Sequence, residues 1–146
     1  MNTNNPVIEP YLFFKGNCEE ALQFYAKALG GKIEALIRFK DSPEAPPPGT
    51  VPPGFENKVM HALIRIGGSA IMASDGCDDQ KSSFQGFSLA FAVPTEAEAD
   101  LAFAALSEGG QVQMPLSKTF WSPRFGMLTD RFGIGWLINT VPAGQK

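Results

Sequence analysis

The feature that most constrains the fold of this chain is a hairpin that occurs twice. Residues 119–140 predict two β-strands joined by a tight turn at Asp130-Arg131-Phe132-Gly133, where glycine can adopt a positive φ. Residues 58–75 predict another strand, turn and strand around Gly67-Gly68. A hairpin in each half of the chain predicts a duplicated structural module.

The segments before the first hairpin complete one module. Aromatic and branched residues predict a strand over residues 8–14. Helical spacing of apolar residues predicts a helix over residues 19–29, which Gly30-Gly31 ends. Asn17 is the expected N-cap, with Glu20 as its capping-box partner.

The strand expected next covers residues 32–39 and alternates, with one side made of Ile33, Ala35, Ile37 and Phe39. The second half then repeats the order. It has a strand over 87–93, a helix over 96–108 with a capping box of Thr95 and Glu98, and a short strand over 111–115.

Each half therefore follows the order β-α-β-β-β. We expect one α+β domain that consists of a first module over about 8–75, a polar linker over about 76–86 and a second module over about 87–140.

Composition narrows the function classes. A net charge of −3 without a cluster of Lys and Arg argues against nucleic acid or an anionic membrane surface as partner. The sequence has neither a signal peptide nor an apolar run of about 20 residues, and its two cysteines form no disulfide framework, so a cytoplasmic location is expected. A single histidine, His61, limits the catalytic chemistry.

Several short motifs carry a family resemblance through their order and spacing: Pro10-Tyr11-Leu12-Phe13-Phe14, Asn17-Cys18-Glu19-Glu20-Ala21, Phe24-Tyr25, Lys58-Val59-Met60-His61-Ala62, Ile71-Met72-Ala73-Ser74-Asp75 and Asp130-x-Phe132-Gly133-x-x-Trp136. With them the chain resembles the vicinal oxygen chelate superfamily, which includes glyoxalase I, extradiol dioxygenases and bleomycin-resistance proteins. The match is strongest to the PhnB-like branch, often labelled 3-demethylubiquinone methyltransferase-like.

The resemblance covers residues 8–139 and implies that two βαβββ modules form one curved eight-stranded mixed sheet around a cleft. It also implies a homodimer, because members usually cover their sheet edges by pairing two chains. The methyltransferase label gains no support from the residues, since the sequence has no glycine-rich nucleotide loop.

Metal-dependent members of the superfamily take one His, Gln or Glu ligand from each of four strands. The matching positions here are Pro10, Met72, Ser88 and Leu137. A register change would offer Tyr11, Ile138 or Asn139 instead. Because divalent ions bind best to imidazole and carboxylate, these residues favour a cleft without a metal or other cofactor.

His61 is the best single candidate for chemistry. Alternation along residues 58–66 puts His61 and Arg65 on one side of the strand, facing the cleft, and an apolar set beneath the helices, namely Met60, Ala62, Ile64 and Ile66. A histidine near neutrality can act as acid, base or hydrogen-bond donor to an anion. The alternative is a structural histidine on a half-buried face.

The segment Phe120-Trp121-Ser122-Pro123-Arg124-Phe125 suits a pocket wall in which Trp121 stacks a flat ligand and Arg124 binds an anionic group. Core or interface aromatics beside a solvated arginine are equally compatible. Tyr11, Phe13 and Asn139 are expected to border the same cleft.

Other motifs carry less weight. The proline-rich residues 41–55 suit either a surface connection or a lid. Cys18 lies in a first helical turn, where the dipole can lower the pKa of a thiol, but nothing nearby in sequence supports a nucleophile.

Asp75, Asp78 and Asp79 miss the EF-hand spacing, which favours a solvated linker. Ser74 lacks the sequence of a nucleophile elbow.

The hypothesis that fits best is a metal-independent small-molecule binding protein that holds an aromatic or anionic ligand between His61, Arg65, Trp121 and Arg124. The first alternative is a glyoxalase- or dioxygenase-like enzyme with a divalent metal at an unrecognised site, where His61 is one ligand and Asn139 or Asp75 assists. The second is a purely structural dimeric module.

Overall fold

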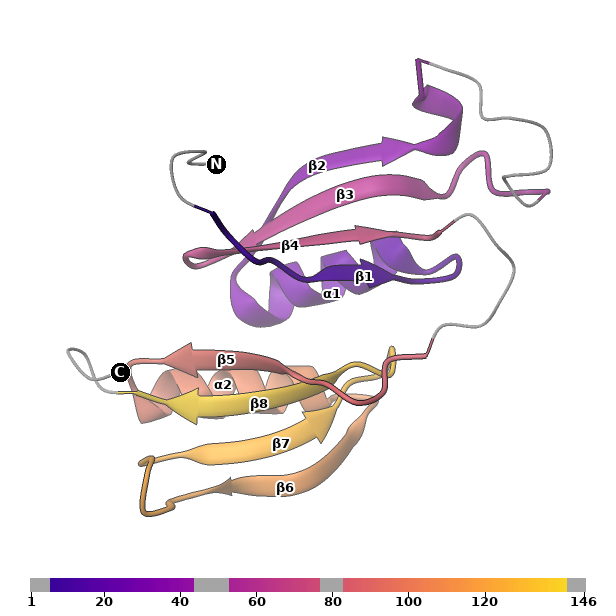
Figure 1. The fold of residues 1–146 in the computed structure, drawn as a ribbon. Helices are drawn as coiled ribbons and strands as arrows, with labels where there is room; N and C mark the ends of the chain where they lie inside the picture. Colours follow the sequence, from indigo (N-terminus) through magenta and orange to yellow (C-terminus); the bar gives the residue numbers. More distant parts are fainter. Residues whose placement is uncertain (1–5, 44–52, 77–82, 142–146) are drawn as a thin grey trace. The chain divides into compact units, whose positions relative to one another are not determined.

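The computed structural model describes residues 6–43, 53–76 and 83–141. The chain divides into two compact units, residues 1–82 and 83–146. Figure 1 shows that both units have the same order of elements, which is a strand, a helix and three further strands.

The first unit contains β1 (Tyr11–Phe13), α1 (Cys18–Leu29), β2 (Lys32–Arg38), a 3-10 turn η1 (Phe39–Asp41), β3 (Val59–Ile66) and β4 (Ser69–Ser74). The strands form a sheet in the order β1-β4-β3-β2, in which only the β1–β4 pair is parallel. Helix α1 lies along one face of this sheet (Figure 1). Its buried side chains include Leu22 and Tyr25, so the core lies between the helix and the sheet.

The second unit contains β5 (Leu89–Val93), α2 (Glu96–Ser107), β6 (Gln111–Ser117), β7 (Phe125–Thr129) and β8 (Gly135–Thr140). Its sheet has the equivalent order β5-β8-β7-β6, again with one parallel pair, β5–β8. Helix α2 packs on one face through Ala99, Phe103 and Leu106. None of the described helices is long and apolar enough to cross a membrane.

The predicted α+β fold of two βαβββ modules is confirmed. Hydrogen bonds join the eight strands into two four-stranded sheets, one in each unit, rather than into one continuous sheet. The two hairpins are also confirmed, with turns at Gly67-Gly68 and at Asp130–Gly133. Residues 120–124 were expected to be part of a strand, but they form the loop between β6 and β7.

The start of α1 differs from the expected capping box. Asn17 occupies the N-cap position, but its side chain makes no capping hydrogen bond. The carboxylate of Asp75 accepts the backbone N–H of Cys18 instead, at 3.0 Å, and that of Gly16, at 2.7 Å. A residue distant in sequence therefore caps the helix. The Thr95 cap of α2 is confirmed, because its hydroxyl accepts the N–H of Glu98.

A β-bulge in β2 overturns the simple alternation expected there. The register shifts between Ile33 and Ala35, which makes Glu34 the extra residue. Ile33 therefore lies on the helix side, whereas Ala35 and Ile37 lie on the opposite face. Phe39 is outside the strand, in η1.

A second bulge changes the start of β3. Ile37 pairs with His61 and Arg38 with Val59, so Met60 is the extra residue. Met60 was expected beneath the helix, but it is half-buried and Val59 is buried in its place. The rest of the alternation holds, because Ala62, Ile64 and Ile66 are buried.

Candidate functional site

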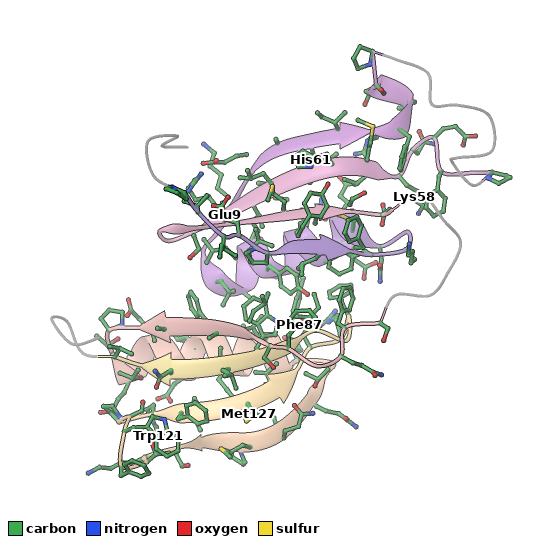
Figure 2. The ribbon with its side chains drawn as sticks, in the orientation of Figure 1. Glu9, Lys58, His61, Phe87, Trp121 and Met127 are labelled. Carbon is green, nitrogen blue, oxygen red and sulfur yellow. The ribbon has the colours of Figure 1, made fainter. Side chains whose placement is uncertain are left out.

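The predicted site residues divide between the two units. The first unit carries Tyr11, Phe13, His61 and Arg65, and the second carries Trp121, Arg124 and Asn139. Figure 2 shows His61 on β3 and Trp121 in the loop that joins β6 to β7. The expectation that both groups line one cleft stays a prediction.

His61 is held by a hydrogen bond to Tyr11. The Nδ1 atom of His61 lies 2.9 Å from the hydroxyl oxygen of Tyr11, and the two rings are 5.7 Å apart. This contact spans β1, β4 and β3, since β4 lies between the other two strands. The register of the sheet thus puts the histidine and the tyrosine on the same face, opposite α1.

This contact leaves the Nε2 atom of His61 available for a ligand. The part of the chain that the structure describes offers Nε2 no hydrogen bond. If the tyrosine hydroxyl donates to Nδ1, neutral His61 carries its proton on Nε2 and donates; in the other tautomer, Nε2 accepts. The pair can therefore recognise either a donor or an acceptor on a ligand.

Aromatic and aliphatic side chains surround this pair. The ring of Phe13 stacks on Tyr11 with a centroid distance of 4.8 Å, and 52% of Phe13 is exposed. Ile37 pairs with His61 across the sheet and is 38% exposed. The face opposite α1 thus combines apolar side chains with polar ones, the His61–Tyr11 pair and Arg65, a mixture found in small-molecule sites.

Arg65 is already paired. Its Nε atom donates to Glu34, the bulged residue of β2, at 3.1 Å. Both side chains are about two-fifths exposed, at 38% each. A ligand that uses Arg65 must share or displace this carboxylate.

The loop between β6 and β7 lines an open pocket of about 550 Å³, which lies wholly within the second unit. It is lined by Glu96 from the first turn of α2 and by loop residues Lys118, Thr119, Phe120, Trp121, Ser122, Pro123 and Arg124. Trp121 is 56% exposed, and its ring makes edge-on contacts with Phe120 at 4.7 Å and Phe125 at 5.4 Å.

Buried hydrogen bonds fix the shape of this loop. The hydroxyl oxygen of Ser122 lies 2.8 and 3.0 Å from the carbonyl oxygens of Arg124 and Thr140, which share its one hydrogen. Thr119 accepts the N–H of Ser122 through its hydroxyl. The backbone is thereby tied to β8, so the pocket wall is largely preformed.

Arg124 connects the loop to α2. Its guanidinium lies 3.2 Å from Asp100 and 3.6 Å from Glu96. The Nε atom is buried and makes no hydrogen bond to any described residue, because the Glu96 carboxylate lies at ion-pair distance only. The two carboxylates offset the positive charge that was expected to attract an anionic ligand.

Asn139 lies on the face of β8 opposite α2, where it pairs with Phe125 and with Ala92. Its side-chain oxygen is buried and makes no hydrogen bond within the described residues. A buried acceptor without a partner costs free energy unless a ligand or water satisfies it. Asn139 therefore suits the ligand-binding role that the sequence predicted.

Cys18, Ser74 and Asp75 have structural rather than catalytic surroundings. Burial, together with the negative charge of Asp75, raises the pKa of the Cys18 thiol and opposes formation of the thiolate. Asp75 is buried and binds three backbone N–H groups, so it does not belong to a solvated linker. The Ser74 hydroxyl accepts from the N–H of Gly76 and His61 bonds to Tyr11, so Ser74, His61 and Asp75 do not form a triad. Asp78 and Asp79 lie outside the described residues, as does most of the predicted lid, residues 44–52.

The superfamily metal positions do not fit a divalent ion in this chain. Pro10 has no side-chain donor and uses its carbonyl oxygen to accept the N–H of Met72. Met72, Ser88 and Leu137 supply neither imidazole nor carboxylate. Within residues 6–43, 53–76 and 83–141, no three His, Cys, Asp or Glu side chains gather closely enough to hold a metal.

Two residues that line the pocket, Lys118 and Glu96, were not identified from the sequence. Glu96 and Asp100 are four residues apart at the start of a predicted helix, a spacing that puts two carboxylates on one face. This spacing could have identified Glu96 from the sequence. Lys118 offered no signal beyond its position before the aromatic segment.

Proteins of known structure share this fold. A protein of known structure from Pseudomonas aeruginosa, PA1353, is 45% identical and superposes with a TM-score of 0.83, covering 94% of this chain and 99% of that chain. The PhnB protein from Bacillus cereus is 28% identical with a TM-score of 0.77, covering 93% of this chain and 100% of its own.

The superfamily resemblance is confirmed at the level of the fold. A glyoxylase/bleomycin resistance protein/dioxygenase domain from Frankia sp. EAN1pec has a TM-score of 0.65 at 14% identity, covering 94% of this chain and 98% of that chain. A sequence model described as 3-demethylubiquinone-9 3-methyltransferase matches residues 6–139, nearly the whole chain. The protein therefore belongs to the family of that name, with the fold of the glyoxalase/bleomycin resistance proteins.

Proposed function

We propose that this protein binds a small molecule without a metal ion, in the manner of a sequestering or recognition protein, and that His61 and Trp121 contact the ligand. The observation that carries the proposal is the pocket of about 550 Å³ beside Trp121. This volume falls within the range of small-molecule sites, and the pocket is open to solvent. Each unit also carries polar groups suited to orienting a ligand, the His61–Tyr11 pair in the first and the buried Asn139 oxygen in the second, although none of these three residues lines this pocket.

Metal independence rests on the residues at the superfamily metal positions. A divalent ion there would face Pro10, Met72, Ser88 and Leu137, so it would gain little from coordination. The family name refers to a methyltransferase, yet the chain has no glycine-rich loop of the kind that holds a nucleotide cofactor. Binding is the function that the described residues support best.

A metal test separates this proposal from the enzyme alternative. Protein purified without chelator is assayed for metal content, and the apo form is titrated with Zn²⁺, Mn²⁺, Ni²⁺ and Fe²⁺ while thermal unfolding is followed. We expect substoichiometric metal and an unchanged unfolding midpoint. Near-stoichiometric metal that raises the midpoint would instead support a metal-dependent glyoxalase- or dioxygenase-like enzyme with His61 as a ligand.

A binding test addresses the site itself. Anilinonaphthalene sulfonate, a flat aromatic anion, serves as the probe, and its fluorescence and the thermal shift that it induces are measured. We expect binding to the wild type that Trp121→Ala and His61→Ala each weaken. Leu101→Ala is the matched control, because this residue is 73% exposed on α2 and does not line the pocket. Unchanged shifts in both site variants would rule out the proposed site.

A further inference from the structure

The pocket beside Trp121 has charges of both signs on separate walls. Glu96 lines the pocket from α2, whereas Asp100, which is not part of the lining, accepts a hydrogen bond from the guanidinium of Arg124 at 3.2 Å. Because Arg124 is hydrogen-bonded to Asp100 and approaches Glu96 only to 3.6 Å, Glu96 is the carboxylate that the pocket lining offers to a ligand. The Glu96 carboxylate remains accessible, since its side chain is 61% exposed.

The loop wall carries one positive charge. Lys118 lines the pocket, and its ammonium forms no ion pair with any described residue. Lys118 rather than Arg124 is therefore the cation that is available to a ligand. The pocket has an aromatic wall as well, formed by Trp121 and by Phe120, which is 98% exposed.

From this arrangement we infer that the pocket takes an aromatic zwitterion of the amino-acid class. Its ammonium group faces Glu96, its carboxylate faces Lys118 and its ring contacts Trp121. A single-charge ligand fits less well. A monoanion leaves the Glu96 carboxylate without a partner, and a monocation leaves Lys118 without one. The inference rests on the proposed function and names the ligand class for the same site.

Three compounds with the same phenyl ring test the charge requirement. L-Phenylalanine carries both charges, phenethylamine carries only the ammonium and 3-phenylpropionate carries only the carboxylate. Affinity is measured by isothermal titration calorimetry at neutral pH. Emission of Trp121 gives a second readout, and Trp121→Phe leaves Trp136, which is buried, as the remaining tryptophan.

Two charge-removing variants identify the contacts. Each charged group is solvent-accessible, so we expect its removal to weaken the matching ligands by about two- to fivefold. Glu96→Gln should weaken phenylalanine and phenethylamine but spare phenylpropionate. Lys118→Gln should weaken phenylalanine and phenylpropionate but spare phenethylamine. Glu98→Gln and Lys32→Gln are the controls, because neither residue lines the pocket.

The possible results separate the two proposals. Tightest binding of phenylalanine, with opposite selectivity changes in the two variants, supports the zwitterion. Equal affinities for all three compounds, unaffected by either variant, overturn it while leaving a small-molecule site in place. If none of the three binds but anilinonaphthalene sulfonate does, the ligand class is wrong and the site stands. Failure of every probe, including the sulfonate, overturns the proposed function as well.

Discussion

At the scale of single residues, buried carboxylates organise both units. Asp75 binds the N–H groups of Gly16, Cys18 and Val59 in the first unit. Asp130 accepts the N–H groups of Phe132 and Ile134 and the indole N–H of Trp136 in the second. The Asp-x-Phe-Gly-x-x-Trp motif therefore forms a hydrogen-bonded turn.

Asp75→Asn should destabilise the protein strongly. An amide has one acceptor oxygen, so at least one of the three bonds, which measure 2.7 to 3.0 Å, must be lost or weakened in a buried place. We expect a decrease of about 2–3 kcal/mol in the free energy of unfolding, measured with urea. Asp41→Asn, at an exposed position, is the control and should change it by less than about 0.5 kcal/mol. Equal effects of the two variants would contradict the anchoring role.

Glu19 contributes a small, pH-dependent stabilisation. Its carboxylate accepts two hydrogen bonds from Arg38, at 2.9 and 3.1 Å, which lower the pKa of Glu19 below its ordinary value of 4.5. Because the folded pKa is the lower one, the stabilisation is fully present above the unfolded pKa and is lost as pH falls through the folded pKa. The side chain is 39% exposed, so solvent screening limits the gain to about 0.5 kcal/mol.

The variant Glu19→Gln tests this linkage. The difference in free energy of unfolding between wild type and variant should be present at pH 7 and disappear in acid. Urea unfolding over a pH series measures it. Glu20→Gln serves as the control, since Glu20 forms no ion pair with a described residue. A difference that persists unchanged into acid would exclude the ion pair as its source.

At the scale of elements, the sequence predicted the order and type of nearly every segment. Glycine turns and helical spacing are local signals, so the two hairpins and two helices could be found from them. The bulges at Glu34 and Met60 could not, because a bulge depends on how two strands pair. The Asp75 cap of α1 was missed for the same reason, since the contact joins residues 57 positions apart in the sequence.

The candidate site was predictable in composition but not in its contacts. His61, Tyr11 and Trp121 were identified as residue types suited to a ligand. The Tyr11–His61 hydrogen bond depends on a strand order in which β4 lies between β1 and β3. The pairing of Arg124 with α2 likewise requires the packing of the helix against the sheet. Sequence patterns give no access to these tertiary contacts.

The junction between α2 and β6 permits only glycine at position 110. A Cβ atom there would overlap the carbonyl oxygen of Thr129 and lie within 3.0 Å of the backbone of Asp130. Gly110→Ala should therefore lower the free energy of unfolding by about 3 kcal/mol, measured by chemical denaturation. Gly68→Ala is the matched control, because a Cβ at Gly68 meets nothing within 4 Å and should change stability little. Similar losses in both variants would contradict the steric explanation.

At the scale of the whole molecule, each unit covers one face of its sheet with a helix and leaves large apolar side chains accessible elsewhere. In the first unit these include Phe13, 52% exposed, and in the second Val112, 47% exposed on β6. Strands β2 and β6 are sheet edges. Natural proteins generally cover such surfaces and edges.

We therefore predict that the protein is a homodimer. Sedimentation velocity over a range of micromolar concentrations should give a mass twice that of the 15.7 kDa chain. The variants Phe13→Ser and Val112→Ser then locate the interface by their sedimentation mass. The thermal unfolding midpoint of each variant is measured alongside, as a check that the variant is folded. A substitution that removes an interface contact should shift the equilibrium toward the monomer. A substitution of an exposed residue outside the interface should leave the sedimenting mass unchanged. A wild type that sediments at the mass of one chain would overturn the dimer, and the apolar surfaces would then be free to bind ligands.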